Sequence, residues 1–224
     1  YNINIIYVVS LDSIKSFCLD KKIIIVGNSS RLFNHNYGRL IDSYDIVVRI
    51  NRGYQQGNLY NKIIGSKTTI LSIGVKSGNA AMEIIGVNPF TYVLSPIIWS
   101  DKLQLPNVYN VEVKDYNILK DSANTNKPST GISTYNFFNN LNSFNRLDLV
   151  GFDFFESSNS FRNQLGHLRV ADHTGIKEKE FFKKVKDNNR TRLYDMKTNN
   201  IPPHNIPTYN HPVAKPHAIK NYKR

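Results

Sequence analysis

The 224-residue chain contains a single cysteine, Cys18, so no disulfide bond can form within it and no zinc site can be built from cysteines. No run of 18 apolar residues occurs, which excludes a membrane-spanning helix in this sequence. The glycine pattern G-x-G-x-x-G is also missing, so a dinucleotide site is poorly supported. Acidic residues are few, 17 against 29 lysines and arginines, and the formal charge is +12. This excess charge suits an anionic partner, although an Asn-, Lys- and Ile-rich composition explains it equally well.

Short apolar runs alternate with helical patterns along most of the chain. Buried strands are predicted at Ile23–Gly27, Asp45–Ile50, Thr68–Ile73, Thr91–Leu94, Leu147–Gly151 and Thr191–Tyr194. Helices are predicted at Arg31–Ile41, at Ala80–Ile85, after Ser129, and at Lys177–Val185, where the pattern is basic and amphipathic. This alternation predicts an α/β fold with a Rossmann-like, mostly parallel central sheet and helices on both faces.

The composition changes beyond Asn199. Most of the nine prolines lie there, among basic residues and without any helical or strand periodicity. We therefore predict one domain over residues 1–199 and a Pro-rich basic tail over residues 200–224 that wraps the surface or is partly disordered.

Polar residues follow two of the predicted strands directly. Gly27, Asn28 and Ser29 come after the first strand, and Asn51 ends the second, with Arg49 two residues before it. In a doubly wound sheet, ligands bind in the loops at the carboxyl ends of the strands. Glycine lets a ligand approach the backbone, and an Asn side chain both donates and accepts hydrogen bonds. Simple turns explain the same residues, so both interpretations stay open.

Two later segments have the same double interpretation. Ser129, Thr130 and Gly131 precede a predicted helix, where a hydroxyl caps the helix and free backbone N–H groups attract an anion. His173 stands five residues before Glu178, and a histidine can take up a proton near neutral pH. Each segment alone is more typical of structure than of function; their order along the chain carries the argument.

Together these segments resemble the sialyltransferases of glycosyltransferase family 29. Their long motif, V-V-G-N-S followed by D-x-V-x-R-x-N, is similar to Ile25, Val26, Gly27, Asn28, Ser29, Gly38, Asp42, Asp45, Val47, Arg49 and Asn51. Their short motif, P-S-T-G with a later strand ending in G-F, is similar to Pro128–Gly131 and to Gly151 and Phe152. Their final motif, H-x-x-x-x-E, is similar to His173 and Glu178.

The resemblance implies a variant of the GT-A-type fold and an inverting transfer of sialic acid from CMP-sialic acid to a glycan or glycolipid hydroxyl. His173 is then the general base, with Glu178 orienting it or holding its loop. The donor site is implied at Gly27, Asn28, Ser29, Asn51, Ser129, Thr130, Gly131, Gly151 and Phe152. No D-x-D pair, with which many nucleotide-sugar transferases hold a metal, occurs in the chain. We therefore expect no metal site and no cofactor, and backbone amides and hydroxyls that stabilise the departing phosphate.

Some features depart from this family. The animal enzymes join their long and short motifs by a disulfide, but the matching positions here are Ile23 and the segment Asn142–Phe144. The segment after Gly151 also resembles bacterial sialyltransferases of glycosyltransferase family 42, in which two tyrosines hold the donor phosphate. Phe155 and Phe161 stand at the similar positions and cannot donate that hydrogen bond. A further family histidine has only His167 as a weak match.

Several alternatives follow. A CMP-Kdo-dependent Kdo transferase of the same fold would need the same CMP contacts. Two further alternatives are a transferase that has kept only CMP binding and a basic nucleic-acid-binding module. The second does not explain the order of the motifs, and we expect no nucleic-acid partner. The basic tail at Lys215–Arg224 is suited to peripheral contact with an anionic membrane. The lone cysteine favours a cytoplasmic location, with the Golgi lumen as the alternative if an N-terminal anchor was removed.

Overall fold

The structure, a computed structural model, describes residues 9–74, 78–85, 90–96, 107–156, 175–187 and 189–196. Its centre is a seven-stranded sheet in the order β5-β4-β3-β2-β1-β6-β7. The strands are β1 (Lys22–Val26), β2 (Ile46–Ile50), β3 (Ile70–Ser72), β4 (Tyr92–Ser95), β5 (Val108–Asn110), β6 (Arg146–Val150) and β7 (Thr191–Leu193). Each strand pairs with its neighbour in parallel. The predicted α/β fold with a parallel, Rossmann-like sheet is therefore confirmed.

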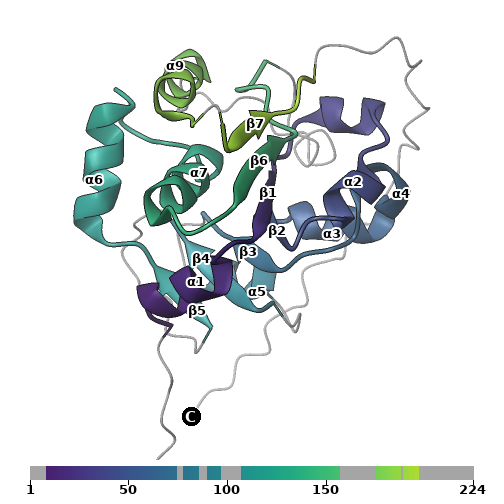
Figure 1. Ribbon diagram of the computed structural model, residues 1–224, viewed down its shortest axis with the longest axis horizontal. Coiled ribbons are helices and arrows are strands. Elements are labelled where there is room, and N and C mark those ends of the chain that lie inside the picture. The colour runs from purple at the N-terminus through teal and green to yellow at the C-terminus, as the bar shows by residue number, and fades with distance from the viewer. Residues whose placement is uncertain are drawn as a thin grey trace, which may run out of the picture.

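Helices cover both faces of the sheet. They are α1 (Leu11–Cys18), the 3₁₀ helix η1 (Ser30–Asn34), α2 (Gly38–Asp42), α3 (Gly53–Leu59), α4 (Asn61–Ile64), α5 (Gly78–Ile85), α6 (Val113–Ser122), α7 (Thr130–Leu141) and α9 (Gly175–Val185). Figure 1 shows α1, α6, α7 and α9 on one side of the sheet and α2, α3 and α4 on the other. The prediction that helices cover both faces of the sheet is thus confirmed as well.

The first strand shows why the strands read as continuous apolar runs. Ile23 and Ile25 of β1 belong to the core cluster that also contains residues of α1, α7 and α9. Ile24 and Val26 belong to a second cluster on the opposite face, with residues of η1, α2 and α4. Because both faces of a parallel sheet are covered, successive side chains are all buried and the usual alternation disappears.

The six predicted strands are confirmed within one or two residues at their ends, but the single helix predicted over Arg31–Ile41 is wrong. The chain forms η1 and α2 instead, and His35 between them has extended backbone angles (φ −129°, ψ 157°). His35 is buried and its ring stacks on Tyr37 at 4.9 Å. The burial of His35 and the long-range contact between Tyr37 and Tyr194 outweigh the local helical preference of the segment.

The predicted boundary after residue 199 and the tail 200–224 lie outside the described residues. Within the parts of the chain that are described, none of the helices has the length and apolar character needed to cross a bilayer.

Candidate functional site

The strand order places a topological switch point between β1 and β6. From β1 the chain continues to β2, β3, β4 and β5 on one side, whereas β6 and β7 lie on the other. The connections that leave the carboxyl ends of strands on either side of such a point run in opposite directions and open a crevice. Gly27 follows β1 and Gly151 follows β6, so two of the predicted donor-site glycines lie at this point.

Gly27 and Gly151 pack against each other through their backbones. The amide of Gly27 donates to the carbonyl of Val150 at 2.8 Å, and the amide of Ser29 donates to that of Gly151 at 3.1 Å. A Cβ on Gly27 would lie 2.3 Å from the Gly151 oxygen, and Gly151 has a φ of +73°. Both positions therefore require glycine so that the two strand ends can approach, which is a structural demand in addition to any contact with a ligand.

Asn28 and Asn51 link the ends of neighbouring strands. The side-chain amide of Asn28 donates to the Ile50 carbonyl at 3.2 Å. Asn51 has a φ of +51°, and its side-chain oxygen accepts from the Gly74 amide at 2.8 Å. Asn tolerates this left-handed backbone better than most residues. Asn28 and Asn51, the two residues predicted to contact the donor sugar nucleotide, thus also fix the loops that form the rim of the crevice.

Arg49 does not face this crevice. Its side chain is 1% exposed and donates to the carbonyls of Ile64, Gly65 and Lys67 at 2.8–3.0 Å. Burial lowers its pKa to about 10, partly offset by the charge of Asp42. Asp42 binds the other side of the same loop, because its carboxylate accepts from the amides of Ser66 and Lys67. Arg49 therefore holds the loop after α4 rather than a ligand.

Replacing Arg49 by lysine tests this structural role. Lysine has no planar fork and cannot reach three carbonyl groups at once, so we expect the free energy of unfolding to fall by about 1–3 kcal/mol. Chemical denaturation of the purified protein measures the change. Arg39→Lys is the matched control, since Arg39 is exposed on α2 and its replacement should alter stability by less than about 0.5 kcal/mol. Equal stability of the two variants would contradict the assignment.

Ser129 and Glu178 are brought together by the fold. Ser129 is the N-cap of α7, and its hydroxyl accepts from the Ile132 amide at 3.3 Å. The Ser129 amide and hydroxyl each donate to a different carboxylate oxygen of Glu178, both at 2.7 Å. Glu178 is 2% exposed, and its burial raises its pKa, an effect that the two bonds from Ser129 partly offset. Its carboxylate thus joins the start of α9 to the start of α7.

Thr130, Gly131 and Phe152 lie beside this junction. A Cβ on Gly131 would lie 2.7 Å from the Phe152 ring and 3.5 Å from Ile50, so glycine is needed here for the ring to pack on the helix. Among the residues with described positions, no acceptor is found for the backbone N–H groups of Thr130 and Gly131. These two groups are among the N-terminal N–H donors that a helix leaves without an internal acceptor, and such donors suit an anion.

A polar network that the sequence did not reveal connects the loop after β1 and η1 with the loop after β6 and with α9. The Ser29 hydroxyl donates to Asp153 at 2.9 Å. Glu156 accepts from Arg31 at 3.2 Å and from Lys179 of α9 at 2.9 Å. Only the charges of these residues were visible in the sequence, because their partners lie more than twenty positions away. The network fixes the loop after β6 against the loop after β1 and against α9.

Between Asp153 and Glu156, two consecutive phenylalanines adopt left-handed backbone angles. Phe154 has a φ of +53° and Phe155 one of +67°. Such angles are strained for bulky residues and are concentrated at functional sites. Phe154 packs on Phe182 of α9, with ring centroids 6.0 Å apart, while Phe155 is 40% exposed. His173, His167 and Phe161, predicted from sequence, lie outside the described residues.

The chain is similar to known glycosyltransferases at three levels. Residues 20–146, more than half of the chain, match glycosyltransferase family 29 (sialyltransferase). A human CMP-N-acetylneuraminate-beta-1,4-galactoside alpha-2,3-sialyltransferase is 44% identical over 61 residues, which cover 27% of this chain and 15% of that protein. The beta-1,6-galactosyltransferase GALT29A of Arabidopsis thaliana is 46% identical over 46 residues, covering 20% of this chain and 11% of that protein.

The fold gives the third level. The crystal structure of a mammalian sialyltransferase in complex with Gal-beta-1-3GalNAc-ortho-nitrophenol superimposes with a TM-score of 0.54. The alignment covers 84% of this chain and 73% of that chain at 18% identity, so it supports the fold. Matched segments span only a small part of the human and plant relatives. On the family match and the confirmed fold, the chain belongs to glycosyltransferase family 29, the sialyltransferase family.

Proposed function

We propose that this protein is an inverting glycosyltransferase that moves sialic acid from CMP-sialic acid to a hydroxyl of an acceptor glycan. One observation carries the proposal: segments distant in sequence meet at the same end of the sheet. The Gly27–Ser29 loop contacts Gly151 and Ile50, Gly131 contacts Phe152 and Ile50, and Ser129 binds Glu178. A nucleotide-sugar site at a switch point needs this convergence of loops and a helix N-terminus.

In this proposal, the phosphate of CMP is stabilised at the start of α7. Ser129 already donates to Glu178, so the free amides of Thr130 and Gly131 take over the contact with the phosphate. Preorganised donors of this kind are each worth roughly 3–4 kcal/mol in comparable sites.

The acceptor hydroxyl needs a base, and His173 remains the proposed one. It stands two residues before Gly175, the first residue of α9, and α9 is held at Ser129 through Glu178. Glu178 uses both carboxylate oxygens for Ser129, so we assign it a positioning role for α9 rather than a proton-transfer role. No metal takes part in the proposed mechanism. CMP-Kdo is the alternative donor, since the CMP contacts would be the same.

The plant relative suggests a second candidate function. It is named as a galactosyltransferase, and it matches this chain as closely as the named sialyltransferases do. The matched stretch is short in both cases. Transfer of galactose from a nucleotide-activated galactose is therefore the second candidate to be tested.

A donor panel in the presence of EDTA tests these proposals. We expect the purified protein to hydrolyse and transfer from CMP-sialic acid, with the rate unchanged by EDTA and by added Mg²⁺ or Mn²⁺. CMP-Kdo and UDP-galactose are offered in parallel, and product formation is followed by mass spectrometry. Activity that disappears with EDTA would contradict the metal-independent mechanism. Saturable CMP binding without turnover of any donor would show that only the binding site has been kept.

A further inference from the structure

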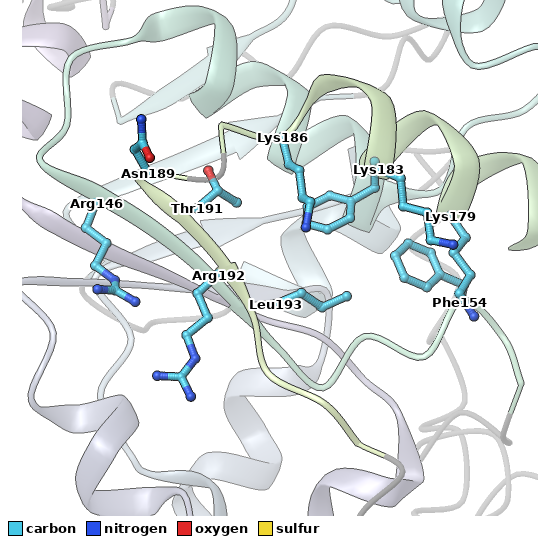
Figure 2. Close-up of a pocket in the computed structure, with 10 residues that line it drawn as sticks. Arg146, Phe154, Lys179, Lys183, Lys186, Asn189, Thr191, Arg192 and Leu193 are labelled. Atoms are coloured by element: carbon cyan, nitrogen blue, oxygen red, sulfur yellow. The ribbon is translucent and has the colours of Figure 1, made fainter.

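Apart from the crevice at the switch point, a pocket lies between α9 and β7. Its volume is about 520 Å³. The residues that line it are Arg146, Phe154, Lys179, Phe182, Lys183, Lys186, Asn189, Thr191, Arg192 and Leu193. Five of these residues are cationic, and no aspartate or glutamate is among them. Figure 2 shows Lys179 and Lys183 of α9 and Lys186 just after it on one side of the pocket, with Arg146 and Arg192 on the strands across from them.

The lysines are aligned by the geometry of the helix. Lys179 and Lys183 lie four residues apart on one face of α9, and Lys186, the residue after the last one of the helix, continues this row because its amide still donates to the Phe182 carbonyl at 3.0 Å. They extend over about 10 Å of helix axis, at 1.5 Å for each residue. The opposite face carries Phe181 and Glu178, which are buried against the body of the protein. The helix is therefore fixed with its cationic face towards β7.

The positive charges in the pocket are only partly neutralised. Arg146 pairs with the buried carboxylate of Asp148 at 2.8 Å, and Lys179 pairs with Glu156 at 2.9 Å. Neither Lys183 nor Lys186 forms an ion pair with any residue that the structure describes. Arg192 lies over the ring of Tyr194, 4.4 Å from its centroid, and has no carboxylate partner in the same part of the chain. Three cations thus remain without a counter-charge, and a concave surface concentrates their field.

We propose that this pocket binds an acidic oligosaccharide, as the anionic part of the acceptor. Cations spread over about 10 Å of α9 fit several carboxylates on successive sugars better than one compact anion. A pocket favours a discrete ligand over a flat membrane surface, and the exposed Asn189 offers hydrogen bonds to sugar hydroxyls. Phe154, the third residue after Gly151 at the switch point, lines the pocket as well, so a chain of sugars in the pocket leads towards the proposed donor site. The acceptor role rests on the proposed glycosyltransferase function.

Direct binding tests the proposal without any need for turnover. Calorimetry with tetragalacturonate, which carries four carboxylates, is compared with maltotetraose, an uncharged tetrasaccharide. We expect the acidic sugar alone to bind, with an affinity that falls as salt is added. Lys183→Glu and Lys186→Glu should each weaken binding by about tenfold, as expected for the loss of one charge-assisted contact. Lys184→Glu is the matched control, because Lys184 is exposed on the same helix and does not line the pocket.

The outcomes separate the pocket from the proposed activity. Equal affinities of the Lys183→Glu and Lys184→Glu variants for tetragalacturonate would overturn the pocket assignment. A protein that binds anionic vesicles through Lys183 but does not bind the sugar would overturn it as well. Donor hydrolysis is measured separately on the unaltered protein. Lysine-dependent sugar binding by a protein that hydrolyses none of the donors would support the pocket and reject the transferase function.

Discussion

Replacing His173 by alanine is expected to lower the rate of sugar transfer by about 10²–10⁴-fold, the usual contribution of a positioned general base. The acceptor hydroxyl is a weak nucleophile, and without a base its proton must leave to water during the attack on the donor. The affinity for CMP should stay unchanged, because the proposed CMP contacts come from the ends of β1, β2 and β6 and from α7. Transfer rates with saturating donor, together with calorimetric titration of CMP, measure the two quantities.

His217→Ala serves as the matched control, since His217 belongs to the Pro-rich tail and has no proposed role in the reaction. It should keep the rate of the unaltered protein. A His173→Ala protein that transfers sugar within threefold of the unaltered rate would remove His173 from the mechanism. The base would then have to be another residue near the start of α9.

Replacing Glu178 by alanine is expected to lower the free energy of unfolding by about 2–4 kcal/mol. The change removes two charge-assisted hydrogen bonds, each worth about 1.5–3 kcal/mol, and leaves the Ser129 amide and hydroxyl without their partner. The relief of a buried charge offsets part of this loss. Urea denaturation followed by circular dichroism measures the effect, and Glu180→Ala, at an exposed position of α9, is the control.

Glu178→Gln separates the hydrogen bonds from the charge. Burial raises the pKa of Glu178, so in the folded state its proton leaves at a higher pH than in the unfolded chain. Stability from this carboxyl group is therefore fully present below the unfolded pKa and is lost as the pH rises through the folded pKa. In acid, the neutral Gln variant should have the same free energy of unfolding as the unaltered protein. As the pH rises to 7, the variant should become relatively more stable. A difference in the free energy of unfolding between the two proteins that stays constant across this pH range would contradict the raised pKa of Glu178.

The strands were predictable because their local pattern and their final environment agree. The pattern of Ile23–Gly27 predicts a buried strand, and β1 lies in the interior of the sheet, between β2 and β6, with both faces covered. Other elements lacked such a signal. Strand β5 has only three residues, two of them part-exposed, so no periodicity marks it. The break between η1 and α2 accompanies the stacking of His35 on Tyr37 and the tilted contact between the rings of Tyr37 and Tyr194. The second contact joins residues far apart in sequence.

The positions that the resemblance aligns with the disulfide of the animal enzymes show the same division. Ile23 and Phe144 stand where the animal enzymes were expected to carry their bridge, and both belong to one core cluster with Cys18. The sequence established that no bridge can form there. The structure adds that apolar packing occupies the place, which a list of residue types does not reveal.

The sequence by itself determined the family, the parallel sheet and the end of the sheet at which the site lies. Motif order and apolar runs are local properties, and parallel strands place their carboxyl ends at one edge. Only the tertiary structure decided what each residue touches: Glu178 binds Ser129, Arg49 turns into the interior, and three lysines in and just after α9 line a pocket with β7. Hydrogen-bond partners and charge balance depend on residues that can lie more than a hundred positions apart, such as Ser29 and Asp153, and packing alone brings them together.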